Sequence, residues 1–491
     1  MITILLIVVP FFSGVVSFFI KDDRPRRALI AVCSIVHLIM AIAVFNFYNK
    51  TQGPLAEWFG FDDIGIIFLL ITSVLFSGAS FYGIRYLSDE EKYAHGGVKG
   101  RGLFSPEAVF GGCFQIFLST MTMVIASRHL AIFWVGIEAT TLASAPLIYF
   151  HRTKMSLEAT WKYLLICSVG IAVALLGIFV LAVANNNRAD LFLARLIENA
   201  NCMNKLWLKA AFLLLFVGYA TKMGLAPFHA WLPDAHSEAP SVVSALFSGA
   251  LLNCAFLGIL RAYQICAAAG LGPYCREVFT VFGLLSVIFA AIFILRQGDY
   301  KRMLAYSSVE HMGIMSLGIG FGGIAVFGAL VNMLGHSLVK AGLFFSAGNI
   351  LSYFRTKRIE DVQGLMSGKT RRLGVLWMLG FLLITGTPPS AIFFGKLIIL
   401  RQALSAGFYA VSIIFLAALV IIFIGMARIV IFMTQGENTC QARGDDSYNV
   451  KGLTRLCVPA VFFAIAIILG LYFPDWLTGI LESASRSLGG P

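Results

Sequence analysis

The chain has 491 residues, of which 59% are hydrophobic and only 13% are charged, and its mean hydropathy is +0.85. A soluble globular protein carries about 25% charged residues, so this composition excludes an ordinary soluble domain and indicates an integral membrane protein. The net charge of +12 would fit a nucleic-acid-binding protein. However, the Lys and Arg residues lie in short loops between apolar runs, as they do in membrane proteins, and no nucleic-acid partner is expected.

Apolar runs of roughly 20 residues, the length that crosses the hydrocarbon core as a helix, recur from end to end of the chain. No polar stretch between them is long enough to form a soluble domain. We therefore predict a single all-α polytopic membrane protein. Its fourteen predicted spans lie near residues 1–20, 27–46, 63–83, 107–127, 130–150, 163–185, 207–226, 241–262, 277–296, 304–321, 324–350, 373–400, 407–433 and 454–473.

The basic residues are unevenly divided between the two sides of the predicted bundle. Loops after odd-numbered spans hold 23 of the 37 Lys and Arg residues, and the opposite side holds 10. Because cytoplasmic loops carry the excess of basic residues, both termini are predicted to lie outside. The nine cysteines form no CxxC pair and lie mostly in apolar runs, so no metal site or iron-sulfur cluster is expected.

Five charged residues remain inside the predicted spans: Lys222, Lys340, Lys396, Arg428 and Glu138. An ionisable group at the bilayer centre costs about 2.5 to 3.5 kcal/mol on insertion scales, so each of them needs a partner or a function. The alternative is a structural anchor near a helix end. We favour that alternative for Arg428, which no motif surrounds.

Two of these residues lie near a predicted helix break. Glu138, in FWVGIEATTLASAPLIYFHR, lies near mid-depth and needs a partner or a proton. Lys222 lies deep in the seventh span, and Pro227 and Pro233 follow where the helix would have to continue. Proline frees backbone carbonyls, which a membrane tolerates only where protein or water satisfies them. We therefore predict a hydrated site beside the break, with His229 inside it as a further possible pathway residue.

The twelfth span, LLITGTPPSAIFFGKLIIL, repeats this pattern with Pro388, Pro389 and Lys396. Breaks five spans apart predict two five-helix repeats of inverted topology, at residues 107–262 and 263–433. An N-terminal three-helix segment would occupy residues 1–106, and a C-terminal helix with a short tail residues 434–491. Interrupted helices at corresponding positions of inverted repeats point to transport sites. The alternative is coincidence, because prolines are common in transmembrane helices.

Between the breaks, NMLGHSLVKAGLFF places His336 and Lys340 four residues apart, on one helix face and about 6 Å apart along the axis. Such a pair can pass on a proton, whereas a histidine alone is more often a packing residue. Glu310 and His311, near the start of the tenth span, are either pathway residues or solvated interfacial residues. A row of buried lysines with a nearby glutamate predicts an ion pump driven by electrostatic coupling.

Three segments then identify a family resemblance. KMGLAPFHAWLPDAHSEAPSVVSAL, GDYKRMLAYSSVEHMG and HSLVKAGLFFSAGNI resemble the antiporter-like subunits shared by respiratory complex I, Mrp-type sodium/proton antiporters and membrane-bound hydrogenases. The resemblance covers about residues 108–402. FWVGIEATTLASAPLI, ATWKYLLICSVGIA and SSVEHMG are most similar to hydrogenase-4 component F of formate hydrogenlyase-type, energy-converting hydrogenase complexes.

This resemblance implies fourteen helices, inverted repeats with broken seventh and twelfth helices, and a hydrophilic axis at mid-membrane. It matches Glu138 to the fifth-helix glutamate that pairs with the seventh-helix lysine, here Lys222. It also matches His336, Lys340 and Lys396 to pathway positions of the eleventh and twelfth helices. Asn253 departs from the pattern, because several relatives carry a lysine there; either Asn253 and water bridge this step or the half-channel is modified.

The implied function is proton translocation by a membrane subunit of a multi-subunit oxidoreductase, a hydrogenase-like complex in a bacterial or archaeal cell membrane. Its expected partners are other membrane subunits, a peripheral redox arm reached through them, and the lipid bilayer. No catalytic residue and no cofactor of its own are expected, because the chain has no haem ligand pair, nucleotide loop or catalytic triad. The alternatives are a subunit of an Mrp-type sodium/proton antiporter and a non-conducting scaffold.

Overall fold

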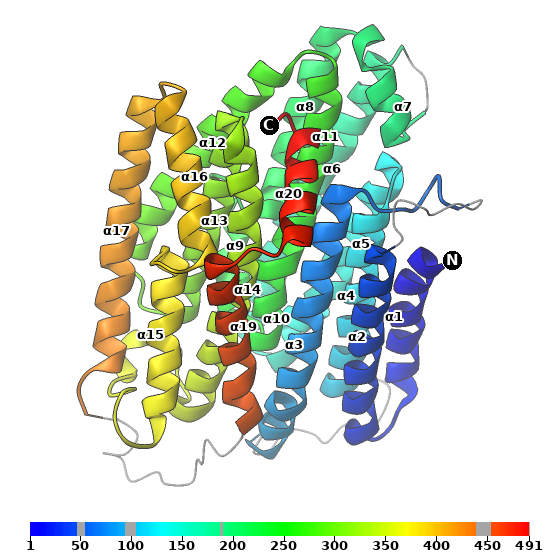
Figure 1. Ribbon diagram of the computed structural model, residues 1–491. Coiled ribbons are helices and arrows are strands. Elements are labelled where there is room, and N and C mark those ends of the chain that lie inside the picture. Colours follow the sequence, from blue (N-terminus) through cyan, green and yellow to red (C-terminus); the bar gives the residue numbers. More distant parts are fainter. Residues whose placement is uncertain (47–54, 94–104, 187–189, 438–452, 491) are drawn as a thin grey trace.

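The computed structural model describes residues 1–46, 55–93, 105–186, 190–437 and 453–490, and within these ranges it is built of helices joined by short connections (Figure 1). The helices of the first half are α1 (Ile2–Phe19), α2 (Asp23–Phe45), α3 (Asp63–Tyr93), α4 (Pro106–Ala126), α5 (Leu130–Ile148), α6 (Lys154–Ala184), α7 (Leu193–Glu198), α8 (Lys205–Met223) and α9 (Trp231–Glu238).

The second half follows with α10 (Ser241–Leu246), which a short π-helix at Phe247–Leu251 joins to α11 (Leu252–Ala268). The remaining helices are α12 (Gly272–Ile294), α13 (Tyr300–Phe321), α14 (Ile324–Phe354), α15 (Arg371–Thr385), α16 (Ala391–Ser405), α17 (Tyr409–Thr434), α19 (Leu453–Leu471) and α20 (Asp475–Ser487).

Eleven of the described helices are long and apolar enough to cross a membrane, or twelve if α19 and α20, bent by 77°, form one span. This number is smaller than the fourteen predicted spans for two physical reasons. The 22-residue α13 carries many polar and charged residues, and α15 and α16 have only 15 residues each because a turn separates them. The sixth predicted span also begins earlier than residue 163, since Thr153 and Ser156 form a capping box that starts α6 at Lys154.

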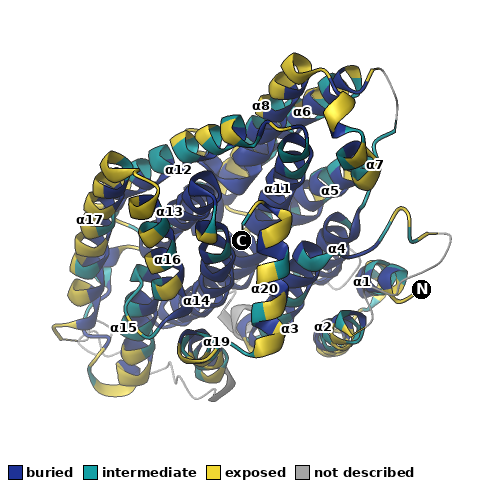
Figure 2. Cartoon of the chain, turned by 45° about the horizontal axis from the view of Figure 1, so that its top comes forward, coloured by how far each residue is buried: buried dark blue, intermediate teal, exposed yellow. Residues whose placement is uncertain are grey.

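The centre of the bundle is formed by α10, α11 and α14, which are buried almost throughout, whereas α1 and α17 expose their outer faces (Figure 2). Around this centre α6 packs against α8, α12 against α13, and α14 against α16. Polar groups placed on α11, α13 and α14 are therefore shielded from the surroundings of the protein.

Two interruptions lie next to the central helices. The first separates α8 from α9, and it begins at Gly224, whose φ of +77° is a left-handed conformation that favours glycine. The carbonyl of Thr221, freed by the end of α8, accepts a hydrogen bond from the Trp231 indole (2.8 Å). The second separates α15 from α16 and begins at Gly386, whose φ is +88°. The first interruption thus ends a helix inside the protein, whereas the second is partly exposed.

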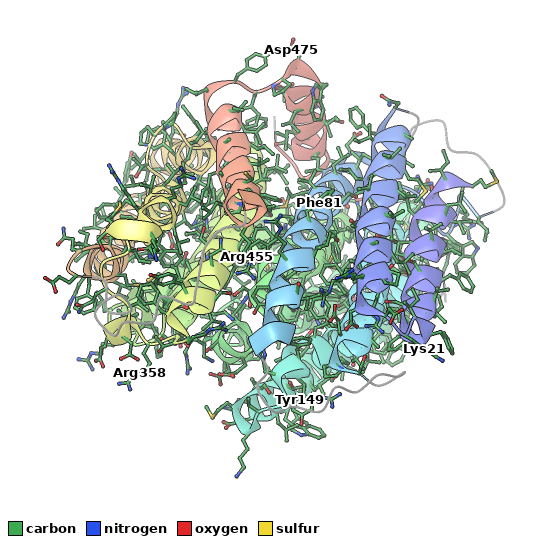
Figure 3. All side chains as sticks on the ribbon, turned by 90° about the horizontal axis from the view of Figure 1, so that it is seen from below. Lys21, Phe81, Tyr149, Arg358, Arg455 and Asp475 are labelled. Atoms are coloured by element: carbon green, nitrogen blue, oxygen red, sulfur yellow. The ribbon has the colours of Figure 1, made fainter. Side chains whose placement is uncertain are left out.

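The ends of α1 and α17 and the start of α19 lie at the lower end of the molecule in Figure 1. Viewed from below, this end carries Lys21, Tyr149, Arg358 and Arg455 (Figure 3). The N-terminus and the end of α20 lie away from it (Figure 1). The predicted basic loops around residues 85–101 and 443–455 fall partly outside the described residues.

Candidate functional site

Lys222 occupies the last turn of α8, immediately before the first interruption, and is fully buried. Its Nζ donates hydrogen bonds to Thr141 Oγ1 (2.5 Å) and to the Tyr163 hydroxyl (2.8 Å). The same ammonium lies 4.8 Å from the centre of the Tyr163 ring, within range of a cation–π interaction. The Tyr163 hydroxyl is also hydrogen-bonded to Ser144 Oγ (2.7 Å). Two hydroxyl groups, one from α5 and one from α6, therefore hold Lys222, and a third hydroxyl, on Ser144, is bonded to one of them.

The expected ion pair between Glu138 and Lys222 is not present, and this part of the sequence-based prediction is wrong for this structure. Glu138 Oε1 accepts a hydrogen bond from Ser168 Oγ (2.8 Å) on α6. Its Oε2 is buried without a hydrogen-bond partner in the part of the chain that the structure describes. The physical reason is that Thr141, one turn further along α5, offers Lys222 a neutral acceptor closer than the carboxylate. Both residues lie near the first interruption, but they are separate.

A second group of polar residues lies where α13 and α14 meet. Lys340 is fully buried on α14, and its Nζ donates to the carbonyl of Leu304 and to Ser307 Oγ (2.9 Å) on α13. His336 lies one turn earlier, with Nε2 3.3 Å from the carbonyl oxygen of Ser248. The sequence-predicted pair thus shares one face of α14; Lys340 hydrogen-bonds to α13, and His336 to the π-helical turn before α11.

Glu310 and His311 belong to this buried region and are not interfacial residues, because their exposed fractions are 1% and 0%. Glu310 Oε1 forms an ion pair with Lys396 Nζ (2.9 Å) on α16. Lys396 also donates to the carbonyl of Thr385 (3.3 Å), one of the carbonyls that the end of α15 leaves without a helical partner. The His311 ring lies 4.8 Å from the His336 ring. The second interruption is therefore joined directly to α13 and α14.

Asn253 lies between the two groups, on α11. Its Nδ2 donates to the carbonyl of Gly249 (2.7 Å) and to Ser337 Oγ (2.8 Å), which is adjacent to His336 in the chain. Ser248, one turn earlier on the same span, hydrogen-bonds to Ser308 Oγ (2.8 Å). Uncharged hydroxyl and amide groups thus occupy the position where several relatives are expected to carry a lysine.

Two of the remaining residues lie apart from these groups. His229, in the turn between α8 and α9, is surrounded by the rings of Phe289, Phe293 and Tyr306, with centroids 5.8 to 6.3 Å away. Arg428 lies exposed near the end of α17. Neither is hydrogen-bonded to the buried lysines within the described ranges.

The hydroxyl groups around the titratable residues were missed from the sequence. Thr141 and Tyr163 contact Lys222, and Ser307 contacts Lys340. Ser144 contacts the Tyr163 hydroxyl, and Ser248 contacts His336. The available signal was the concentration of Thr and Ser within the apolar segment EATTLASAP that follows Glu138. A hydroxyl in a membrane helix can bond its own backbone carbonyl, so such a signal does not by itself indicate a site.

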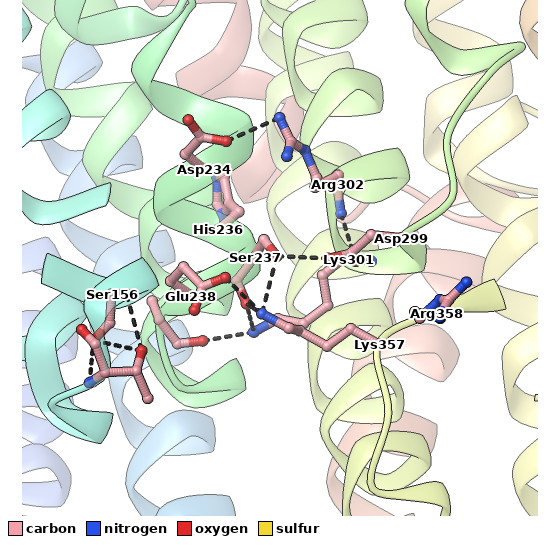
Figure 4. A network of polar contacts seen from close by, with 12 residues as sticks. Ser156, Asp234, His236, Ser237, Glu238, Asp299, Lys301, Arg302, Lys357 and Arg358 are labelled. Carbon is pink, nitrogen blue, oxygen red and sulfur yellow. Dashed lines mark hydrogen bonds and ion pairs between the residues drawn. The ribbon is translucent and has the colours of Figure 1, made fainter. Parts of the chain in front are cut away.

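A further polar cluster lies around α9 and α13 (Figure 4). Asp234 pairs with Arg302 (2.9 Å) and with Lys162 (3.0 Å), while Glu238 pairs with Lys357 (2.7 Å). Lys301 donates to the carbonyl of Ala239 (2.5 Å), at the end of α9. Positive charges near a helix C-terminus are favourable, so this cluster holds the short helix that follows the first interruption.

At the start of α3, outside the spans, Asp62 binds the guanidinium of Arg261 with both carboxylate oxygens (2.5 and 2.6 Å). It also accepts the backbone N–H of Gly65 (2.9 Å). Burial raises the pKa of the Asp62 carboxyl, but the charge and hydrogen bonds of Arg261 outweigh this effect, and the pKa lies below its usual value. This contact joins α3 to α11.

The chain is similar to membrane subunits of known respiratory and antiporter complexes. Residues 127–422 match the family described as NADH:quinone oxidoreductase/Mrp antiporter, transmembrane. The hydrogenase-4 component F homolog of Methylacidiphilum infernorum (isolate V4) is 33% identical over 441 residues, which is 88% of each chain.

Two solved structures share the fold. A chain of the membrane-bound sulfane sulfur reductase, an archaeal respiratory membrane complex, superposes with a TM-score of 0.84 at 20% identity, over 99% of this chain and 98% of that one. A chain of respiratory complex I from Thermus thermophilus with bound NADH gives a TM-score of 0.81 at 20% identity, over 100% of both chains.

Proposed function

Because the chain belongs to the NADH:quinone oxidoreductase/Mrp antiporter transmembrane family, we propose that it is the proton-translocating membrane subunit of a multi-subunit oxidoreductase, specifically a hydrogenase-like complex. The observation that carries this proposal is the set of three buried ammonium groups, on Lys222, Lys340 and Lys396, which are hydrogen-bonded inside an otherwise apolar bundle. Ionisable residues inside a membrane are costly and typically mark ion pathways.

The proposed architecture has fourteen spans. These are the eleven apolar helices, α13, the pair of α15 and α16 as a broken twelfth span, and α19. The broken seventh span consists of α8 and α9. Residues 107–262 and 263–433 would form two inverted five-helix repeats, flanked by the segments 1–106 and 434–491. Support comes from the two interruptions, which both begin at a glycine with positive φ next to a buried lysine.

Protons would move along the buried row of Lys222, Lys340 and Lys396, and Glu138 would act on Lys222 through its charge. Lys222 and Lys340 are held by neutral hydroxyl and carbonyl groups, and Lys396 is held by a carboxylate. Because the row is buried, the charge of one site alters the proton affinity of the next. Asn253 carries no titratable group. The step between Lys222 and His336 would therefore use hydroxyl groups, amide groups and water, with Ser248 and Ser337 as the protein's contribution.

The proposed partners are neighbouring membrane subunits and, through them, a peripheral redox arm. Glu138 supports this proposal because its half-buried carboxylate lies between Val135 and Leu142, which are 50% and 61% exposed on the lateral face of α5. A neighbouring membrane subunit at this face would shield the carboxylate from lipid and act on its charge. The proposed location is a prokaryotic cell membrane with both termini outside.

The proposal is tested in vesicles that contain the complete complex, with proton uptake and redox turnover measured together. Glu138→Gln removes the charge but keeps the hydrogen bond to Ser168, and we expect it to abolish proton uptake while the complex assembles normally. Arg428→Gln, which lies exposed outside the row, is the matched control and should pump like the unmodified complex. Normal pumping by Glu138→Gln would instead support a non-conducting scaffold.

The transported ion is tested separately by replacing sodium with choline in the assay medium. A proton-translocating subunit retains its proton uptake without sodium. A strict requirement for sodium would contradict the proposal and support an exchanger of the Mrp type.

A further inference from the structure

We propose that Tyr163 passes protons to Lys222 from the inner, basic end of the molecule, through a path of hydroxyl groups at the seam between α5 and α6. This inference rests on the proposed function and adds to it the route by which one member of the row is loaded. The buried row itself does not supply such a route, because Glu138 does not contact Lys222.

The contacts of the Lys222 ammonium define the upper end of the path. Its two hydrogen bonds go to Thr141 and Tyr163, and all three side chains are fully or almost fully buried. The ring of Tyr163 packs against Trp231 (centroids 5.0 Å apart) and is stacked on Phe247 (5.9 Å). These rings fix the phenol, so its hydroxyl is held between Lys222 and Ser144.

From this point hydroxyl groups continue toward the inner end of both helices. On α6, Ser156, Thr160 and Tyr163 recur at helical spacing on the buried face, with exposed fractions of 0%, 8% and 0%. Seven residues of helix span about 10 Å. On α5, Ser144 lies one turn beyond Thr141 and close to the end of the helix at Ile148. The two stripes face the same seam, since Ser144 and Tyr163 are hydrogen-bonded.

The inner end of α6 lies beside paired acidic groups. Ser156 lies in the first turn of α6, and the close view in Figure 4 includes it together with Asp234 and Glu238. The Asp234 carboxylate, 21% exposed, is paired with Lys162 of α6. Asp234 is paired with Arg302 as well, and Glu238 with Lys357, so cations hold both carboxylates beside the inner end of α6.

The transfer balances without placing a charge on the phenol. When the Lys222 amine is neutral, Tyr163 donates its hydroxyl proton to Nζ and at the same time receives the proton of Ser144 Oγ. Ser144, whose hydroxyl otherwise donates to the carbonyl of Thr140 (2.6 Å), regains a proton from a hydronium ion of the inner aqueous phase, which becomes water. One O–H bond breaks and one forms at each hydroxyl, and the net change is one proton added to Lys222.

The test is the substitution Tyr163→Phe in the complete complex. It removes the relay hydroxyl but keeps the ring packing, and we expect proton uptake per electron to fall at least about tenfold. We also expect a larger ratio of rates in H2O and D2O than in the unmodified complex, because proton delivery becomes limiting. Tyr219→Phe is the matched control: Tyr219 is buried one turn before Lys222 and packs against Phe133 (5.7 Å).

The outcomes separate this inference from the proposed function. Loss of pumping in Tyr163→Phe with a raised isotope ratio, but not in Tyr219→Phe, supports the path. An equal loss in both variants with unchanged isotope ratios shows a packing role and overturns it. Normal pumping by Tyr163→Phe while Lys222→Met is inactive overturns the path but leaves the proposed function intact. Normal pumping by Lys222→Met contradicts both.

Discussion

The ion pair between Glu310 and Lys396 joins α13 to the second interruption, as does the hydrogen bond between His311 Nε2 and the carbonyl of Ile384 (3.1 Å). Removing one partner of the ion pair should be costly. The two charged atoms are 2.9 Å apart, and the exposed fractions of the side chains are 2% and 9%. At an effective dielectric constant of about 20, Coulomb's law gives an attraction of roughly 6 kcal/mol at this distance. Desolvation offsets part of this energy, and breaking a buried pair by removing one partner costs about 3 to 5 kcal/mol.

Glu310→Gln and Lys396→Met each leave one uncompensated buried charge. At an unfolding entropy of about 2.1 cal/mol/K per residue, a chain of this length unfolds at a temperature roughly 1 °C lower for each kcal/mol of unfolding free energy that it loses. Each single variant should therefore lower the unfolding temperature by about 3 to 5 °C. The double variant buries no isolated charge. It should therefore unfold at a higher temperature than either single variant, as expected for residues in direct contact.

The assay is thermal unfolding of the purified complex, followed by intrinsic tryptophan fluorescence. Glu277→Gln, a charge-neutralising change on α12 outside the row, provides the baseline. A stabilising role of the ion pair would be contradicted by single variants that unfold within about 1 °C of the unmodified complex, or by a double variant whose loss in unfolding temperature equals the sum of the two single losses.

Three further predictions concern the ends of the helices and the step between the two groups. Asp62→Asn should lower the free energy of unfolding by about 1 to 2 kcal/mol at pH 7. Because the folded-state pKa of Asp62 is lowered, this difference in unfolding free energy should shrink as the pH falls below 3.8. A pH-independent difference would contradict the role of the Asp62 charge. Gly224→Ala adds a Cβ 2.4 Å from Leu232 Cδ1 at a positive φ, whereas Gly270→Ala meets only the strain of its φ, so the unfolding temperature should fall further in the first variant. Asn253→Leu removes the hydrogen bonds to Gly249 and Ser337 and should slow proton uptake at least about tenfold. Asn253→Lys should retain proton uptake. Equal uptake by both variants would show that Asn253 has no part in the pathway.

The sequence alone predicted the features that depend on local chemistry. Apolar runs of sufficient length predicted the membrane helices, and prolines beside buried lysines predicted where helices end. The structure places a helix end within a few residues of each expected site, at Met223 and at Thr385. These features could be predicted because the missing N–H of proline and the conformational freedom of glycine act on the few residues around them.

The partners of the lysines could not be predicted, because they depend on how the helices are rotated against one another. Glu310 and Lys396 are 86 residues apart, and nothing local indicates that they pair. For Lys222 the sequence suggested a partner that the structure does not provide. Glu138, the acid placed at mid-depth, was expected to pair with it, but packing brings the hydroxyl groups of Thr141 and Tyr163 closer. Hydroxyl residues also bond their own helix, so their frequency in apolar segments does not reveal which of them face a charge.

Proton movement through the row of buried lysines can be checked by measuring proton uptake and redox turnover in the same vesicles for complexes that carry Lys222→Met or Lys340→Met. We expect both variants to assemble and to lose proton uptake. Proton uptake at the unmodified ratio to electron transfer in either variant would contradict this expectation.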